Sequence, residues 1–274
     1  MSRTTTDTET GTVTSPDGTE IAFERSGGGA PLVLVHGATL DHRMWELSDV
    51  RSTLAEETTV YAIDRRGRGG SGDAEEYDPE REFEDIAAVV DSIDEPATLL
   101  GHSAGGFYTL EAALRTDNSC GLVLYEPAMP INGYAIGSEE VRAEMLSLLD
   151  AGESERAYEL FFEEIAEWTP EEVDAVRSAS TWRDHVERFP TLLPKYGMIP
   201  EYEFEPDRFA DLATPTVLLT GTESGGWAND VTVALDDVLP NSRVVTFDGQ
   251  GHAAMLTAPG RFTEAVLAFV REIH

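Results

Sequence analysis

Short apolar runs alternate along the chain with segments of helical periodicity, and this alternation restricts the possible folds more than any other feature. Near-continuous apolar runs bounded by turn residues are typical of parallel strands that are covered on both faces. Strands that alternate with helices predict a doubly wound α/β sheet with right-handed crossovers. The runs are PLVLV from Pro31, TTVYAID ending at Asp64, ATLL from Ala97, GLVLY from Gly121, PTVLL from Pro215 and RVVTF from Arg243.

Turn and capping residues mark the edges of this pattern. Thr12–Ser15 and Thr19–Glu24 flank a Pro-Asp-Gly turn, so they predict a hairpin at the start of the fold. Asp78 followed by Pro79 is typical of a helix start, because the carboxylate caps the first turn and proline fits the first helical position. A second helix begins at Pro259 and continues to the end of the chain.

One long stretch breaks the alternation, since we find no convincing strand between about Ala128 and Ala210. Ser138 can cap a first helix there, Glu153–Trp168 has the pattern of a second, and the Thr169-Pro-Glu-Glu sequence is a capping box for a third. We interpret the stretch as a helical lid inserted in the sheet domain. The expected division is a core of residues 1–127 and 211–274 and a lid of residues 128–210.

The charge of the chain is strongly negative. Asp and Glu number 52 against 19 Lys and Arg, for a net charge of −33, and Lys195 is the single lysine. Such a surface repels phosphate backbones and anionic lipids, so we expect neither a nucleic-acid partner nor a membrane. The acids are dispersed rather than gathered in a tail. Dispersed acidity with almost no lysine is similar to the proteins of extreme halophiles, where high salt screens the self-repulsion.

The cysteine content and the hydropathy of the chain exclude some sites and predict a location. Cys120 is the only cysteine, which excludes an intramolecular disulfide and a Cys-based metal site, and its apolar neighbours suggest a core position. No run reaches the roughly 18 apolar residues that a membrane helix needs, and the N-terminus has no apolar signal segment. We therefore expect a cytoplasmic protein.

The strongest local motif is Gly101-His-Ser103-Ala-Gly105, which follows a predicted strand and precedes a helical segment. A serine at such a strained strand-to-helix turn projects its hydroxyl above the sheet, where it can act as a nucleophile. Side chains two positions before and after the serine would collide in this turn, which explains the two glycines. The start of the following helix also favours developing negative charge. We predict that Ser103 is the nucleophile.

Two further loops are expected beside this serine. The sequence LVLVHGA ends in a loop whose Ala38 N–H can join that of Ala104 in an oxyanion hole, while His36 more simply holds the loop. Gly249-Gln-Gly-His252 follows the last strand. A histidine on a glycine-rich loop at a strand's carboxyl end is well placed to take a proton from Ser103.

Together these motifs resemble the α/β-hydrolase family over nearly the whole chain. The matching segments are HGAT at His36, DRRGRGGSG at Asp64, GHSAGG at Gly101 and GQGH at Gly249. The resemblance implies an α/β-hydrolase fold: an eight-stranded, mostly parallel sheet with helices on both faces and a helical lid after the sixth strand. It also implies a Ser–acid–His triad that needs no cofactor or metal. Asp64 and its glycines are expected to hold the fold, and the neighbouring arginines to pair with acids.

The sequence departs from the family at the acid of the triad. In the family the acid usually follows the seventh strand, but that position is Ser224 here. Asp230 lies beyond two glycines, and Glu223 is a third candidate. Some family members place the acid after the sixth strand, where this chain has Glu126. We favour Glu126, because a strand end holds a side chain more firmly than a loop does.

The function that follows is a serine hydrolase for an ester or related acyl bond of a small molecule. Ser103, His252 and Glu126 would be catalytic, and lid aromatics such as Trp168, Trp182 and Tyr196 would line an acyl pocket or, more simply, pack in the lid core. The alternatives are a carbon–carbon bond hydrolase, a haloperoxidase-like enzyme, and a catalytically silent ligand-binding module. The substrate and the oligomeric state are not readable from the sequence.

Overall fold

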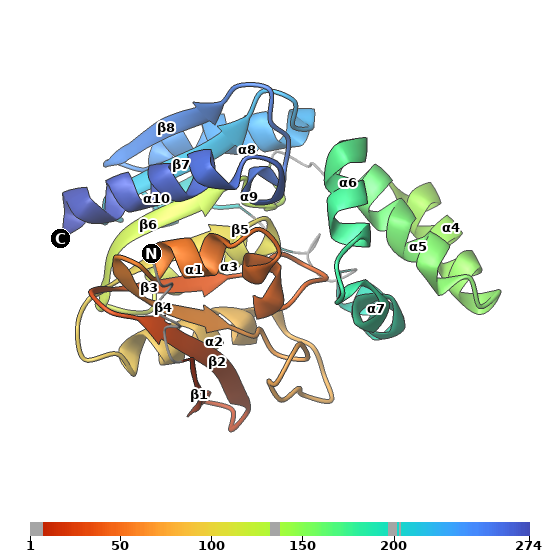
Figure 1. Cartoon of the computed structure of the whole chain (residues 1–274), viewed down its shortest axis with the longest axis horizontal. Coiled ribbons are helices and arrows are strands. Elements are labelled where there is room, and N and C mark those ends of the chain that lie inside the picture. The colour runs from red at the N-terminus through yellow and green to blue at the C-terminus, as the bar shows by residue number, and fades with distance from the viewer. Residues whose placement is uncertain (1–7, 132–137, 197–201, 203) are drawn as a thin grey trace, which may run out of the picture.

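A single eight-stranded sheet forms the centre of the protein (Figure 1). The computed structural model of the chain describes residues 8–131, 138–196, 202 and 204–274. The strand order is β1-β2-β4-β3-β5-β6-β7-β8, with β2 antiparallel to both of its neighbours and every other pairing parallel. The strands are β1 Glu9–Thr14, β2 Glu20–Gly27, β3 Ala30–Val35, β4 Thr58–Ile63, β5 Ala97–His102, β6 Ser119–Tyr125, β7 Thr216–Gly221 and β8 Ser242–Phe247.

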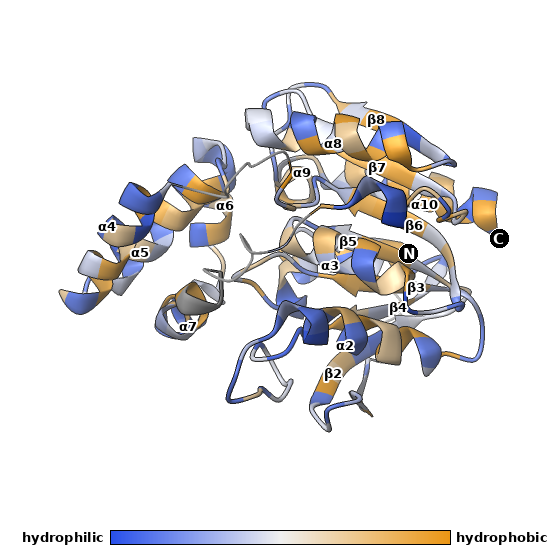
Figure 2. Cartoon of the chain, turned by 180° about the vertical axis from the view of Figure 1, so that it is seen from behind, coloured by the Kyte–Doolittle hydropathy of each residue, from blue (hydrophilic) through white to orange (hydrophobic). Residues whose placement is uncertain are grey.

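The apolar runs that form β3 to β7 are buried on both faces, as expected for covered parallel strands. The run from Arg243 is an exception, because β8 is the edge strand of the sheet and Val244 is 40% exposed. Along β3, Leu32 and Leu34 join one hydrophobic cluster and Val33 and Val35 join the other, because successive side chains of a strand point to opposite faces. Helices α1 Val50–Leu54 and α10 Pro259–Ile273 cover the first face. Helices α2 Pro79–Asp91, α3 Ala104–Ala113 and α8 Gly226–Val238 cover the second. In Figure 2 the central strands are mostly apolar, whereas the helices carry both kinds of residue.

Predicted helix starts agree with the structure. The Asp78 carboxylate accepts a hydrogen bond from the N–H of Glu80, with Pro79 at the first helical position of α2. The Thr169 hydroxyl and the Glu172 carboxylate form the expected capping box at the start of α6. Because a helix leaves its first N–H groups without internal partners, these side chains fix where each helix begins.

Between β6 and β7 the described residues contain helices and loops but no strand. The helices are α4 Glu139–Asp150, α5 Ser154–Leu160, the π-helical turn η2 Phe161–Ile165, α6 Pro170–Arg177, α7 Trp182–Tyr196 and the short η4 Pro206–Arg208. Figure 1 shows α4 to α7 as a layer beside the carboxyl ends of the strands. No helix in the described part of the chain has the length and apolar character needed to cross a bilayer.

Two further local predictions were wrong. The helix expected over Glu153–Trp168 stops earlier, because α5 widens into a π-helical turn after Leu160 and Glu167 then adopts a left-handed conformation with φ 51°. Cys120 is half-buried rather than in the core, since it lies near the start of β6, where its Sγ is 3.4 Å from Nε2 of His274.

Candidate active site

Ser103 occupies a strained turn between β5 and α3. Its φ of 55° and ψ of −126° lie outside the regions that most side chains adopt. A Cβ on Gly101 would lie 2.6 Å from the carbonyl oxygen of Gly105, and one on Gly105 would lie 2.3 Å from that of His36. Both glycines are therefore required by the close approach of the backbone, as the sequence predicted.

The backbone around this turn is held by hydrogen bonds to neighbouring segments. Ser103 N–H donates to the carbonyl of Tyr125 at the end of β6, over 3.0 Å. The Ser103 carbonyl accepts from Gly106 in α3 and from Ala128, which lies beyond β6. The serine is thus fixed to two strand ends at once, and its strained conformation is maintained by the surrounding fold.

A buried carboxylate contacts the histidine of the GQGH loop. Nδ1 of His252 lies 2.6 Å from Oε2 of Glu126, and both side chains are almost completely buried. The other oxygen, Oε1, accepts hydrogen bonds from Gly221 N–H at 2.7 Å, Thr220 Oγ1 at 3.1 Å and Ser224 Oγ at 2.5 Å. Glu126 is thus oriented by three donors from β7 and the loop that follows it.

The other two candidate acids lie elsewhere. Glu223 and Asp230 are both exposed, and neither has a hydrogen bond or ion pair to His252 among the described residues. Ser224, which stands where the family usually has its acid, instead donates to Glu126. The structure therefore brings together His252, Glu126 and Ser224 and leaves Asp230 and Glu223 at the surface.

The second ring nitrogen of His252 is buried and has no hydrogen-bond partner among the described residues. The ring of His102 lies 4.7 Å away and that of Trp227 lies 5.0 Å away, measured between ring centroids. Nε2 of His102 also contacts the carbonyl of His252 at 2.8 Å. With Nδ1 taken by Glu126, the histidine retains Nε2 as a base.

The loop after β3 lies against the serine turn. Ala38 and Ala104 line one pocket together with Ser103. A Cβ on Gly37 would lie 3.4 Å from Cβ of Ser103, which shows how closely the loop approaches. Ala104 is the first residue of α3, where backbone N–H groups point out of the helix and favour an anion. Both alanines are therefore close to the predicted nucleophile.

His36 is buried, and its ring contacts the backbone of two loops rather than Ser103. Its Nδ1 lies 2.8 Å from the Gly37 carbonyl and its Nε2 accepts from the Arg65 N–H at 3.1 Å. Burial and the charge of Arg65 lower the pKa of His36 to about 3, so the ring is neutral and joins two loops. Its structural role agrees with the prediction.

The DRRGRGGSG segment also has the structural role predicted for it. Asp64 accepts from the N–H groups of His42 and Gly70, at 3.0 and 2.8 Å. The three arginines after it are buried and contact acids of α2: Arg65 and Arg68 contact Glu82, and Arg66 contacts Asp85.

The pocket above Ser103 has an empty volume of about 630 Å³, including its open mouth. Its walls combine the serine turn, the loop after β3 and the inward faces of α4, η2 and α7. Trp168 and Trp182 do not line it. Trp182 packs on Tyr158 in the helical layer, and the ring of Trp168 lies 6.4 Å from that of His252, between ring centroids. The side chain of Tyr196 lies outside the described residues. The lining residues are Ala38, Ser103, Ala104, Ala128, Arg142, Met145, Phe161, Ile165, Ala166, Leu193 and Trp227.

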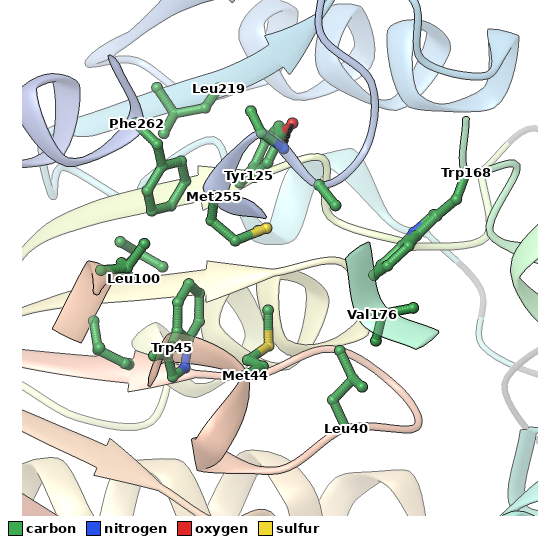
Figure 3. Packing of buried hydrophobic residues seen from close by; sticks show 14 of the residues in the cluster. Leu40, Met44, Trp45, Leu100, Tyr125, Trp168, Val176, Leu219, Met255 and Phe262 are labelled. Atoms are coloured by element: carbon green, nitrogen blue, oxygen red, sulfur yellow. Dashed lines mark hydrogen bonds between the residues drawn. The ribbon is translucent and has the colours of Figure 1, made fainter. Parts of the chain in front are cut away.

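Sequence reasoning missed one contact to the histidine loop. Glu172 is buried, and besides capping α6 its Oε1 accepts from the N–H of Ala253, beside His252, at 2.5 Å. Tyr125 accepts from the next N–H, that of Ala254, at 3.0 Å. Figure 3 shows Trp168 and Val176 of the helical layer near Leu40 and Met255 of the core. The capping-box motif indicated Glu172 but gave no sign of this second contact.

Within the part of the chain that the structure describes, two groups of side chains have the spacing of metal ligands, and both include His42. One adds Glu24 and Glu46, and the other adds Asp41 and Asp64. Their atoms already have protein partners: Arg51 contacts both glutamates, and Asp64 contacts Nδ1 of His42. None of these residues lines the pocket above Ser103.

The chain is similar to known hydrolases over nearly its full length. A putative carbamate hydrolase RutD of Azorhizobium caulinodans is 26% identical over 266 residues, 93% of this chain and 96% of that protein. A pimeloyl-[acyl-carrier protein] methyl ester esterase of Aeromonas hydrophila is 26% identical over 258 residues, 91% of this chain and 99% of that protein.

Solved structures give the same result. An alpha/beta hydrolase from Sphaerobacter thermophilus has a TM-score of 0.75 at 33% identity, covering 93% of this chain and 99% of that one. The esterase RhEst1 from Rhodococcus has a TM-score of 0.79 at 24% identity, covering 97% and 99%. The sequence model of the alpha/beta hydrolase family matches residues 32–265. The chain therefore belongs to the alpha/beta hydrolase family and is a hydrolytic enzyme.

Proposed function

We propose that the protein is a serine hydrolase that cleaves an ester or related acyl bond of a small molecule through an acyl-enzyme. The observation that carries the proposal is the buried contact of 2.6 Å between Glu126 and His252. A carboxylate on Nδ1 fixes the tautomer that leaves Nε2 able to accept a proton. Ser103, on its strained turn, lines the adjoining pocket.

The proposed reaction uses the chain's own groups. His252 Nε2 takes the hydroxyl proton of Ser103 as the serine oxygen attacks the acyl carbon. The backbone N–H groups of Ala38 and Ala104 stabilise the oxyanion that forms. His252 then gives its proton to the leaving alcohol. Water, deprotonated by the same nitrogen, releases the acid and restores Ser103.

Relatives support this class of reaction. Proteins 26% identical to this chain over most of its length are named as a putative carbamate hydrolase and as a methyl ester esterase. Others are named as haloperoxidases, including a putative bromoperoxidase at 24% identity. We therefore retain haloperoxidase-like or carbon–carbon bond hydrolysis on the same triad as the alternative.

We also propose that the helices between β6 and β7 form a lid, with residues 128–210 as the lid and residues 1–127 and 211–274 as the core. The support is the pocket wall: Met145 of α4, Phe161 of η2 and Leu193 of α7 lie above Ser103 in one lining. Because substrate must pass or displace these side chains, the lid would select the acyl group.

The dispersed acidity supports a further proposal, that the protein works at molar salt in the cytoplasm of a halophile. At about 1 M salt the Debye length shrinks to about 3 Å, which removes most of the repulsion among 33 excess negative charges.

The test of the catalytic proposal is hydrolysis of p-nitrophenyl esters of rising chain length in molar KCl, together with labelling by a fluorophosphonate probe. We expect labelling at Ser103, and loss of both labelling and hydrolysis in Ser103→Ala and His252→Ala. Asp230→Asn is the matched control, because that acid is exposed. An unlabelled wild-type protein without hydrolysis would instead support a silent ligand-binding module.

A further inference from the structure

Apart from Ser103 itself, the side chains that line the pocket are apolar except at one point. Alanine, methionine, phenylalanine, isoleucine, leucine and tryptophan side chains form most of the lining. Among the described lining residues, Arg142 of α4 is the only one with a charged side chain, and no acid joins it there. Met145, which lies one turn further along the same face of α4, is buried in the core cluster.

Arg142 differs from most of the other described arginines in its partners. In a chain with 52 acids, most described arginines contact a carboxylate. Arg115 and Arg208 share buried Glu111, and Arg271 contacts Glu57. Arg142 has no hydrogen bond or ion pair from its side chain to any described residue, although it is partly buried.

A guanidinium beside an apolar wall loses part of its hydration, and this cost is compensated only when an anion binds to it. Its planar fork fits a carboxylate through two parallel hydrogen bonds. We propose, on the basis of the proposed serine hydrolase function, that Arg142 binds an anionic group of the substrate. The substrate class is then an ester whose acyl chain ends in a carboxylate.

The net charge of the protein gives a local cation in the pocket a clear role toward an anionic substrate. Thirty-three excess negative charges repel an anion at long range. Molar salt restricts that repulsion to about 3 Å, while a direct contact in a partly buried pocket is screened much less. Arg142, which lines the same pocket as Ser103, can then distinguish an anionic ester from a neutral one.

The reaction balances as ordinary ester hydrolysis. Ser103 forms the acyl-enzyme as the alcohol leaves, and water releases the acid; a monoester of a dicarboxylic acid thus gives the alcohol, the dicarboxylate and one proton. Arg142 takes no part in bond making. It would hold the far end of the acyl chain, so its loss should raise KM more than it lowers kcat.

The kinetic test uses monomethyl esters of linear dicarboxylic acids, from succinate to suberate. Each is compared with the analogue in which a primary amide replaces the free carboxyl group. The amide keeps the shape and removes the charge. We expect the wild type to prefer the acid by kcat/KM for at least one chain length. Arg142→Gln should reduce that preference by roughly 10- to 100-fold through KM, and Arg142→Lys by less.

Arg183→Gln is the matched control, because Arg183 is an exposed arginine of α7 that does not line the pocket. It makes the same change in net charge and should leave the acid preference as in the wild type. The proposal would be overturned if wild type and Arg142→Gln preferred the acid over the amide to the same degree. It would also be overturned if Arg183→Gln reduced this preference as much as Arg142→Gln does. Melting temperatures of the variants show whether each is folded.

A binding measurement separates this proposal from the catalytic one. The Ser103→Ala variant should bind one of the monomethyl esters at least about tenfold more tightly than its amide, by calorimetry, and adding Arg142→Gln should remove the difference. If no ester is hydrolysed but this binding is found, the catalytic proposal fails and the anion site stands. If esters are hydrolysed through Ser103 and no acid binds better than its amide, the anion site is refuted.

Discussion

Replacing Glu126 by glutamine tests the proposed triad most sharply, because the structure dictates how the amide must lie. Gly221 N–H can only donate, and it points at Oε1 of Glu126 over 2.7 Å, as the hydroxyl of Ser224 does over 2.5 Å. The amide oxygen of the glutamine must therefore take the place of Oε1. Its NH2 group then faces Nδ1 of His252.

An NH2 donor at Nδ1 reverses the histidine tautomer. Nδ1 must then accept, so the proton moves to Nε2, which can no longer take the hydroxyl proton of Ser103. By analogy with the loss of the triad carboxylate in serine proteases, kcat should fall by about 10⁴-fold, which corresponds to roughly 5.5 kcal/mol of transition-state stabilisation.

Stability should change far less than activity. The glutamine keeps the shape of Glu126, and an oxygen still meets the donors of Thr220, Gly221 and Ser224. Each bond weakens from a charged to a neutral acceptor, but the buried charge is also removed, so the net change in the free energy of unfolding should stay within about 2 kcal/mol.

The assay measures kcat on a p-nitrophenyl ester in molar KCl, with melting temperature in the same buffer. Glu223→Gln and Asp230→Asn are the matched controls, since both acids are exposed and lie in or just after the loop that follows β7. A Glu126→Gln protein with kcat within about tenfold of wild type would refute the tautomer argument. Equal loss in Asp230→Asn would refute the assignment of the acid.

Four further results are expected. The melting temperature should rise between about 0.1 M and 3 M KCl as salt screens the acidic surface, and an unchanged value would contradict the halophilic proposal. Glu172→Ala removes a helix cap and the bond to Ala253, so it should cost about 1–2 kcal/mol of stability and lower kcat about tenfold, by calorimetry and kinetics. Ser103→Gly should abolish hydrolysis yet stabilise the protein by about 1 kcal/mol, because glycine tolerates φ 55°, whereas Ser103→Ala should abolish hydrolysis without that gain. The folded-state pKa of His36, about 3, lies below its usual 6.5, so its contribution to stability is present above pH 6.5 and lost as the pH falls toward 3. Chemical unfolding should show a slope of about 1.4 kcal/mol per pH unit from this group, which His36→Gln should remove.

Features set by local backbone chemistry were predictable from the sequence. The glycines around Ser103 follow from the close approach of backbone at the turn, and the capping box at Thr169 fixes the start of α6. The two faces of the sheet follow from apolar runs such as that around Val33. In each case a short local sequence pattern indicates the feature.

Features that depend on how the helical layer lies on the sheet were not predictable. Arg142 and Trp168 both lie in stretches that the sequence predicts to be helical, yet Arg142 lines the pocket, whereas Trp168 is in a loop and packs in the core cluster. The second contact of Glu172 arises because α6 lies against the histidine loop, a contact across 81 positions of sequence. The π-helical turn at Phe161–Ile165, which ends the helix early, has no signal in the apolar periodicity.

The hydrogen bond between Ser224 and Glu126 has a consequence for how such a site evolves. The ends of β6 and β7 are neighbours, so a carboxylate from either strand can reach the same ring nitrogen of His252. Moving the acid from one strand to the other takes two substitutions, and their order matters. If Glu126 is lost first, the intermediate has no carboxylate, and the proposed triad predicts that it is inactive. If Ser224→Asp comes first, two carboxyl groups share the space, and their repulsion keeps one protonated while the other still serves the histidine. Lineages that exchange the position of this acid are therefore expected to pass through the intermediate with two acids.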